Sequence, residues 1–196
     1  PGFGQSPAPP AAWSLDDYAD CVLGFLAALE VETCILFGHS FGCRVILKIC
    51  ARQLPTPVVP KVVLTGAAGL RHETNPHQTK KAKRYQLGKK ILRPFPRLME
   101  WWRQQHGSAD YKAASPLMRQ VLVKAVNEDL TDLLPLVTPP TLLIFGRHDT
   151  ATPLADGQRM ERNIPGAGLV VLEGTHYAFL ECQAQFLRVM GSFLQI

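Results

Sequence analysis

Apolar and polar residues follow two patterns along this chain, one typical of helices and one typical of buried strands. After Ser14 the apolar residues Tyr18, Val22, Phe25 and Leu29 recur every three or four positions, which predicts an amphipathic helix capped by Ser14. Short apolar runs without polar alternation occur elsewhere, and such runs are typical of parallel strands that are buried on both faces. The runs span residues 33–37, 62–65, 141–145 and 169–172.

Helical segments separate the predicted strands. The segment after residue 42 is apolar except for one polar stripe, which consists of Arg44, Lys48 and Arg52. Thr152 and Pro153 have the residue types expected at the N-cap and the first position of a later helix, and the C-terminal segment again has a helical pattern. Strands that alternate with helices predict an α/β fold in which helices flank a parallel sheet.

The pattern changes between residues 66 and 138, where basic and aromatic residues replace clear strand signals. Short helices are predicted at residues 78–92, 97–105 and 116–127. The alternation of strands and helices resumes after this segment. We therefore expect an α/β core made of residues 1–66 and 139–196, interrupted by a helical insertion at residues 67–138.

Composition places the chain among globular proteins. Of its 196 residues, 46% are hydrophobic and 19% are charged, as expected for one domain with a substantial core. No apolar stretch reaches the roughly 18 residues of a membrane-spanning helix, so stable membrane insertion is not expected. The five cysteines are odd in number and lie in apolar segments, which indicates reduced thiols and a cytoplasmic location. Since no Cys or His spacing matches a zinc site, no metal ion is expected.

The net charge of +5 is concentrated in residues 71–103, where Lys and Arg far outnumber Asp and Glu. The simpler interpretation of this basic segment is a solvated helix face, and the alternative is a preference for anionic substrates. No recognised nucleic-acid-binding motif accompanies the charge, so a nucleic-acid partner is not expected. The pattern predicts no particular oligomeric state.

Residues 38–42 read Gly-His-Ser-Phe-Gly and have the form G-x-S-x-G between a predicted strand and a predicted helix. Such a motif forms a strained strand-to-helix turn that lifts the hydroxyl of Ser40 clear of the sheet as a nucleophile. The helix N-terminus favours developing negative charge, and the backbone N–H of Phe41 can serve as one oxyanion-hole donor. The alternative interpretation is a Gly-Ser turn that merely starts a helix.

A serine nucleophile needs a base and a group that orients the base. His176 follows the last predicted strand, and Asp149 follows the strand before it. Both loops leave the sheet at the edge where the loop of Ser40 also begins. If these residues act together, a carboxylate oxygen of Asp149 lies within about 3 Å of a ring nitrogen of His176.

Other polar residues near these positions have simpler interpretations. His39 and His148 are neighbours of the candidate residues, but adjacent positions on a turn face other ways, so both are predicted to be structural. Glu128, Asp129 and Asp132 form an acidic cluster. This cluster is interpreted as a solvated helix end, with an alternative role as the acid that orients His176.

Four motifs in the same order resemble those of the α/β-hydrolase superfamily. Residues 1–6 are similar to its P-G-x-G-x-S loop, and residues 38–42 to its nucleophile elbow. Residues 146–153 have the form G-x-x-D-x-x-x-P of its acid loop, and residues 174–176 the form G-x-H of its histidine loop. The resemblance spans the whole chain and implies the C-terminal two-thirds of an α/β-hydrolase fold.

The resemblance also assigns roles along the chain. The order Ser40, Asp149, His176 is the nucleophile–acid–base order of that superfamily. The resemblance also implies that residues 67–138 form a cap that covers the active site and shapes the substrate pocket. Cys43 stands where many members have a second glycine, and because cysteine is small we expect little consequence.

A larger departure concerns the segment that precedes Pro1. Superfamily members have about four strands before the P-G-x-G loop, and a His-Gly loop among them supplies the second oxyanion-hole donor, which is not in this sequence. We therefore expect the natural protein to carry roughly 70 further N-terminal residues. Without them, the strand predicted at residues 33–37 would be an exposed sheet edge with apolar side chains in water.

These observations predict a hydrolase without a cofactor that cleaves an ester, thioester or small amide of a small-molecule substrate. Ser40 would form an acyl-enzyme, His176 would accept and return the proton, and Asp149 would fix the histidine tautomer. The alternative from another class is a non-catalytic binding protein that keeps the fold. A hydrolase that selects anionic substrates through the basic cap is a further alternative.

Overall fold

The computed structural model describes residues 1–71, 94, 98 and 109–196. The described chain forms two compact units. One consists of Trp13–Arg71 and Ala125–Ile196, and the other of Pro1–Ala12 with the described part of His72–Lys124. The predicted helices at 78–92 and 97–105, with most of the basic segment, lie outside the described residues.

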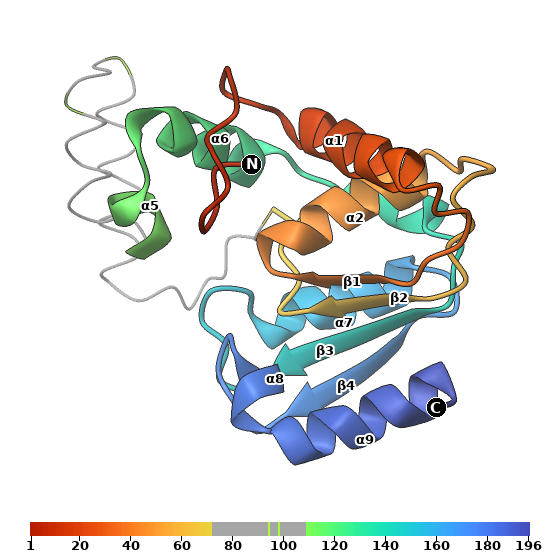
Figure 1. Ribbon diagram of the computed structural model, residues 1–196. Coiled ribbons are helices and arrows are strands. Elements are labelled where there is room, and N and C mark those ends of the chain that lie inside the picture. The colour runs from red at the N-terminus through yellow and green to blue at the C-terminus, as the bar shows by residue number, and fades with distance from the viewer. Residues whose placement is uncertain (72–93, 95–97, 99–108) are drawn as a thin grey trace. The chain divides into compact units, whose positions relative to one another are not determined.

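The larger unit is built on a parallel four-stranded sheet, as the sequence predicted (Figure 1). The strands lie in the order β1-β2-β3-β4. Their bounds are Leu36–His39 for β1, Val62–Thr65 for β2, Thr141–Gly146 for β3 and Gly168–Leu172 for β4. The predicted strands at 62–65, 141–145 and 169–172 are confirmed to within one residue.

The register of the sheet brings the carboxyl ends of all four strands to one edge. His39 of β1 pairs with Thr65 of β2, and Gly146 of β3 pairs with Leu172 of β4. The loops that follow the strands therefore start side by side. Ligands and reacting groups of open α/β sheets are characteristically held in loops at this edge.

Helices cover both faces of the sheet. On one face α9 (Gln183–Leu194) packs its side chains Phe186 and Met190 on a cluster that includes Val63 and Ile144. On the other face lie α2 (Phe41–Ala51) and α7 (Leu154–Asn163), as Figure 1 shows. Gly157 of α7 lies so close to the ring of Phe145 that a Cβ at this position would be 2.8 Å from it. Burial on both faces explains why β2 and β3 have continuous apolar sequences.

The N-terminal helix α1 (Leu15–Ala28) begins at the predicted N-cap. Ser14 accepts a hydrogen bond from the N–H of Asp17, and the carboxylate of Asp17 accepts one from the N–H of Ser14, which is a complete capping box. Helix α1 packs on α2. Lys48 of α2 pairs with Asp16 of α1 at 2.8 Å, so part of the predicted polar stripe serves to join the two helices.

The first strand begins three residues later than predicted. Thr33 forms only an isolated bridge with Val58, and regular pairing starts where Leu36 meets Val62. Between these two contacts lies Pro60, which has no N–H to donate to a ladder. The proline therefore separates the isolated bridge from the strand.

Strand β1 forms one end of the described sheet, and its exposure differs from the prediction of burial on both faces. Phe37 is 46% exposed, and the neighbouring Ile35 is 45% exposed. Within the described sheet, only β2 lies beside β1. The position of β1 at one end of the described sheet therefore explains the apolar exposure.

Residues 125–138 belong to the sheet-bearing unit. The buried guanidinium of Arg44 donates to the carbonyl oxygens of Ala125 at 2.7 Å and of Glu128 at 3.0 Å. A 3₁₀ helix, η1 (Thr131–Leu136), packs on α2. The predicted insertion at 67–138 thus includes residues that pack on helix α2 of the sheet-bearing unit, and its function as a cap stays a prediction.

The smaller unit contains α5 (Ala109–Ala113) and most of α6 (Pro116–Asn127), which has the bounds predicted for it. The N-terminal loop is attached to α6. Lys124 donates a hydrogen bond to the carbonyl oxygen of Ala12, and a Cβ at Gly2 would lie 2.2 Å from Sδ of Met118. Among the described residues, no helix has the length and apolar character required to cross a membrane.

Candidate active site

Ser40 lies in the turn between β1 and α2, at the carboxyl edge of the sheet. Its φ of +49° and ψ of −108° are rarely adopted by residues with a side chain, and such a conformation costs about 1–3 kcal/mol. The turn is held by hydrogen bonds from the N–H of Ser40 to the Thr65 carbonyl at 3.1 Å and from the N–H of Cys43 to the Ser40 carbonyl at 3.2 Å. The hydroxyl of Ser40 does not cap α2. The backbone thus presents a strained serine at a helix N-terminus.

The two glycines of the motif have different surroundings. A Cβ at Gly38 would lie 2.7 Å from Cδ1 of Ile46 and 3.1 Å from the backbone nitrogen of Cys43, so the turn requires glycine there. At Gly42, no described atom lies within 4 Å of an added Cβ. Cys43 is fully buried, and burial raises the pKa of its thiol. The tight packing of the turn therefore depends on Gly38 rather than on Gly42.

Asp149 lies in the loop after β3, and its carboxylate is completely enclosed. Oδ1 accepts the N–H groups of Ala151 at 2.8 Å and Thr152 at 2.9 Å, and Oδ2 accepts the Thr152 hydroxyl at 2.7 Å. Burial by itself raises the pKa of Asp149, but the hydrogen bond from His176 and those from Thr152 and Ala151 outweigh it, and the pKa is lower than usual. The carboxylate is consequently ionised at neutral pH.

The carboxylate of Asp149 also accepts a hydrogen bond from His176. Nδ1 of His176 lies 2.7 Å from Oδ2, within the distance expected from the sequence. Because an ionised carboxylate can only accept, Nδ1 carries a proton, and Nε2 of the neutral ring is left as the basic nitrogen. The side chain of His176 is 18% exposed, so this nitrogen belongs to a ring that is still accessible.

The acidic cluster near residue 130 has other partners. Glu128 forms an ion pair with Lys48 at 2.5 Å. Asp129 accepts hydrogen bonds from Thr131 and from the N–H of Arg71. In the described part of the chain, the carboxylate beside His176 is therefore that of Asp149 and not one of this cluster.

Hydrogen bonds to Glu181 and close backbone contacts hold the loop that carries His176. The carboxylate of Glu181 accepts the N–H of Thr175 at 2.6 Å and its hydroxyl at 2.5 Å. At Gly146 an added Cβ would lie 2.1 Å from the carbonyl oxygen of Thr175, so the acid loop and the histidine loop touch through their backbones. Gly66, with φ of +49°, lies against the imidazole, because a Cβ there would be 3.1 Å from Nδ1 of His176.

The position of His39 contradicts the prediction that its side chain faces away from the candidate residues. The centroid of its ring lies 4.7 Å from that of His176. His39 is the last residue of β1, and alternation along a strand places it on the same face as Phe37. The strand direction, and not the turn that follows, determines where this ring lies. His148, in contrast, is exposed and has Nε2 3.6 Å from Glu173.

Sequence reasoning missed three residues that support the candidate site. The contact of Thr152 with Asp149 could have been predicted, because a threonine three residues after an aspartate is typical of a local turn closed by side-chain hydrogen bonds. Thr152 was predicted as an N-cap, but α7 has Pro153 in that position while the Thr152 hydroxyl bonds Asp149. Gly66 left a weaker signal as a glycine directly after a strand. Glu181 left none, because its contact with Thr175 arises from the turn into α8 (Ala178–Glu181).

The structure brings Ser40 and His176 to the same neighbours, but in the described residues it contains no hydrogen bond between the two. The N–H of Ser40 donates a hydrogen bond to the carbonyl of Thr65, which is the residue before Gly66. In the sequence, Ser40 directly follows His39. Both His39 and Gly66 touch the imidazole of His176. Phe41 opens α2, so its N–H lies at the positive end of that helix. Nucleophile–base contacts are often long in unliganded enzymes.

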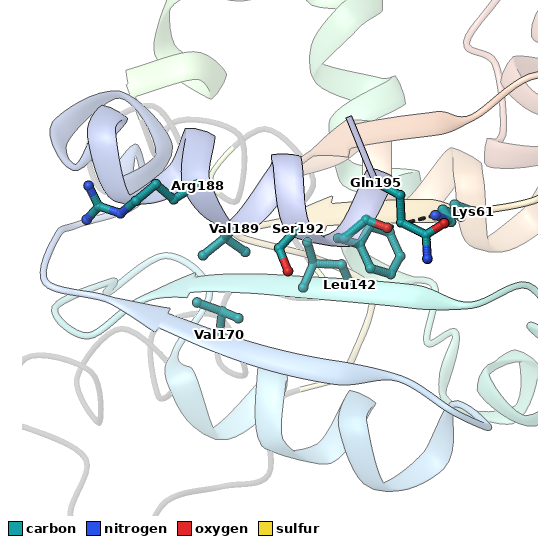
Figure 2. A pocket seen from close by; sticks show the side chains of 8 residues that line it. Lys61, Leu142, Val170, Arg188, Val189, Ser192 and Gln195 are labelled. Atoms are coloured by element: carbon teal, nitrogen blue, oxygen red, sulfur yellow. Dashed lines mark hydrogen bonds between the residues drawn. The ribbon is translucent and has the colours of Figure 1, made fainter.

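Two further features of the sheet-bearing unit bear on the choice of site. No group of three or more His, Cys, Asp or Glu residues placed to hold a metal ion occurs among the residues described. A hollow of about 700 Å³ lies between α9 and the sheet, and Figure 2 shows Lys61 and Arg188 at its sides with Leu142 and Val189 between them. Because Lys61 precedes β2 and Leu142 is the second residue of β3, this hollow extends toward the amino ends of the strands, whereas Ser40 follows the carboxyl end of β1.

Comparisons with known proteins agree with this architecture. The sequence model of the family described as "Alpha/beta hydrolase family" matches residues 1–189. The AB hydrolase superfamily protein YisY of Bacillus subtilis is 26% identical over 212 residues, which cover 98% of this chain and 78% of the relative.

Solved structures of similar fold cover the complete chain. An esterase from Exiguobacterium antarcticum has a TM-score of 0.73 and 24% identity, and the match covers 100% of this chain and 79% of the esterase. An enol-lactonase from Burkholderia xenovorans LB400 has a TM-score of 0.72 and 21% identity, with 100% of this chain and 78% of the lactonase covered. At these identities the structures establish the shared fold alone.

Proposed function

The chain belongs to the alpha/beta hydrolase family, and we propose that it is a serine hydrolase that cleaves an ester, thioester or small amide through an acyl-enzyme on Ser40. The observation that carries the proposal is the hydrogen bond of 2.7 Å between Nδ1 of His176 and an enclosed, ionised Asp149. This contact leaves Nε2 of His176 as a base. The strained Ser40, which follows His39 and whose N–H bonds the carbonyl of the residue before Gly66, is the nucleophile that the proposal pairs with this base.

The chemistry follows from these positions in two steps. In the first, Oγ of Ser40 attacks the substrate carbonyl carbon while its proton moves to Nε2 of His176, and the histidine then returns that proton to the leaving group. In the second, water attacks the acyl-enzyme, its proton passes to Nε2, and the proton is returned to Oγ as the acid leaves. In both steps Asp149 stabilises the imidazolium and holds the tautomer.

Negative charge develops on the carbonyl oxygen in both steps. The N–H of Phe41 is the donor that the proposal assigns to this charge, because it lies at the N-terminus of α2, where the helix dipole also favours an anion. Loss of one such donor typically lowers turnover by 10²–10³-fold. A small-molecule acyl substrate is the partner that this arrangement requires.

Labelling with a fluorophosphonate probe tests the proposal. We expect the probe to modify the wild-type protein, since it phosphonylates serines activated by a base. Ser40→Ala should abolish labelling. Ser192→Ala is the matched control, because Ser192 borders the hollow toward the amino ends of the strands, and it should be labelled at the wild-type rate. Labelling that survives Ser40→Ala, or a wild-type protein that is never labelled, would contradict the assignment and favour a non-catalytic binding protein.

A further inference from the structure

His39 stands out because a polar ring is packed among aromatic side chains at the candidate site. Its ring centroid lies 4.7 Å from that of His176, 5.2 Å from that of Tyr177 and 5.0 Å from that of Phe179. The proposed mechanism assigns no proton transfer to this ring. Its position beside the base nevertheless gives it a direct way to affect catalysis.

The hydrogen bonds of His39 determine its tautomer. Nδ1 lies 3.1 Å from the carbonyl oxygen of Thr65 and 3.1 Å from the Thr65 hydroxyl oxygen. That hydroxyl donates its own proton to the Gly38 carbonyl at 3.2 Å, so both Thr65 oxygens accept from Nδ1. The proton of a neutral His39 is therefore on Nδ1, and Nε2 is an unprotonated acceptor.

The other nitrogen of His39 has no hydrogen-bond partner. Nε2 is buried and unpaired in the part of the chain that the structure describes. Leaving such a group unpaired costs about 1–3 kcal/mol. Burial, together with the nearby His176, lowers the pKa of His39, so its ring is neutral at neutral pH. The ring thus occupies this position despite an energetic cost, and without a charge that would oppose protonation of His176.

Several groups besides Asp149 contact the imidazole of His176. The Thr152 hydroxyl oxygen lies 3.3 Å from Nδ1, and the centroid of the Tyr177 ring lies 5.5 Å from that of the imidazole. Gly66 approaches Nδ1 and Cε1 so closely that a Cβ there would be 3.1 and 3.2 Å from them. His39 contacts the same ring from β1, which is part of the sheet and not of a loop. The imidazole of His176 is 18% exposed and donates to Asp149 through Nδ1 alone. Without neighbours that pack against it, the ring could tilt about this hydrogen bond.

We propose that His39 is a positioning residue: its neutral ring, anchored to Thr65, holds the imidazole of His176 with Nδ1 toward Asp149 and Nε2 toward Ser40. This inference rests on the proposed function. It assigns the effect to the shape and neutrality of the ring and not to proton transfer by His39. Misplacement of a catalytic group by about 1 Å can lower turnover by 10²-fold, which sets the scale of the effect.

Two substitutions separate the ring from its hydrogen bond. His39→Phe keeps an aromatic ring beside His176 and removes the bond to Thr65, whose carbonyl still accepts the N–H of Ser40. His39→Asn keeps an N–H near Thr65 and removes the ring. With a nitrophenyl ester, we expect kcat of His39→Phe to stay within about threefold of wild type. For His39→Asn we expect kcat to fall by about 10- to 100-fold with little change in KM.

The proton on Nδ1 of His176 gives a second readout, which a purely structural role of His39 would not affect. Its low-field NMR signal should persist in wild type and His39→Phe and broaden in His39→Asn, while thermal unfolding shows that the variants fold. Equal loss of kcat in both variants would overturn the proposal, because the Thr65 bond and not the ring would then matter. Unchanged kcat in His39→Asn would overturn it as well.

Labelling of Ser40 in the same samples distinguishes the two proposals. If wild type is labelled and neither His39 variant changes kcat, the positioning role alone is wrong. If Ser40 is not labelled in wild type, the serine mechanism is wrong and the positioning role is rejected with it.

Discussion

Asp149 stays ionised although its side chain is withdrawn from water. Three donors on its own loop and the imidazole of His176 supply hydrogen bonds that favour the charged form. An ionised acid next to a histidine fixes which ring nitrogen carries the proton. At the residue scale, Asp149 therefore determines the tautomer of His176, and so which nitrogen is the base, before any substrate is present.

The first prediction concerns Asp149→Asn. The amide presents an N–H₂ group where Oδ2 accepted hydrogen bonds, so His176 is driven toward the wrong tautomer. We expect kcat for a nitrophenyl ester to fall by about 10³–10⁴-fold. Asp132→Asn, in the exposed acidic cluster, should leave kcat unchanged. A loss of less than tenfold in Asp149→Asn would show that the acid does not orient the base.

The lowered pKa of Asp149 adds a test that uses stability. A carboxyl with a lower pKa in the folded state stabilises the fold at any pH above its unfolded value of about 3.9, and this contribution is lost as the pH falls below that value through the folded pKa. The difference in melting temperature between wild type and Asp149→Asn should thus change in favour of the variant as the pH falls from 5 to below 4. A difference that stays the same between pH 5 and pH 3 would contradict this assignment.

At the scale of elements, the turn between β1 and α2 depends on one glycine more than on the other. Gly38→Ala would force a Cβ against Ile46 and the Cys43 backbone. Gly42→Ala adds a methyl group where no described atom is within 4 Å. We expect Gly38→Ala to lower the free energy of unfolding by about 1–3 kcal/mol, and Gly42→Ala to change it by about +0.4 to +1 kcal/mol through the unfolded state. Chemical denaturation measures both, and an equal loss in the two variants would contradict the distinction.

Helix α2 provides a second comparison, between a buried and an exposed arginine. Arg44 is 7% exposed and donates to two carbonyl oxygens at the end of α6, while Arg52 pairs with Asp16 and Asp20 at the surface. Removing the guanidinium takes a charged donor away from both carbonyls and leaves the Ala125 carbonyl with the N–H of Glu128 at 3.3 Å. Arg44→Ala should therefore cost about 2–4 kcal/mol in the free energy of unfolding, and Arg52→Ala about 0–1 kcal/mol. Similar losses in urea unfolding of both variants would show that the buried contacts contribute little.

Short sequence patterns predicted the helices, strands and turn well, and contacts between distant segments explain the features that these patterns did not predict. The capping box of α1, the bounds of β2 and the G-x-S-x-G turn are each specified by a few adjacent residues. The start of β1 was misplaced because Pro60, on a different segment, interrupts the pairing. The exposure of Phe37 depends on the position of β1 in the sheet, which no local pattern encodes.

The candidate site was predictable to the extent that chain order determines it. Asp149 and His176 could be paired from sequence because both follow parallel strands whose ends share one edge. The ring of His39 could not be oriented from the turn alone, because the strand before the turn sets its direction. The contact of Glu181 with Thr175 required the path of the chain into α8, which has no sequence signature of its own.

At the scale of the whole molecule, the exposed edge is the feature with the clearest consequence. Strand β1 forms one end of the described sheet, and Ile35 and Phe37 along it are almost half exposed. Edges of this kind pair with other edges. We expect residues 1–196, expressed alone, to self-associate at micromolar concentrations, as measured by size-exclusion chromatography with light scattering.

A charged side chain at this edge should reduce the association. Ile35→Lys is expected to shift the protein toward monomer, whereas Leu187→Lys, at a 57% exposed position on α9, should not. Both substitutions add the same charge, so only the position differs. A wild-type chain that is monomeric, or equal behaviour of the two variants, would show that the edge of β1 does not drive association.

In the proposed mechanism, Ser40 carries the acyl group during turnover. The most direct test is to mix the protein with a nitrophenyl ester, quench with acid within the first turnovers, and map the modified peptide by mass spectrometry. We expect an added acyl mass on Ser40 that appears with the released nitrophenolate and decays as the free acid forms, with no such adduct in Ser40→Ala. Turnover of the ester without an adduct on Ser40, or with the acyl group on another residue, would contradict this mechanism.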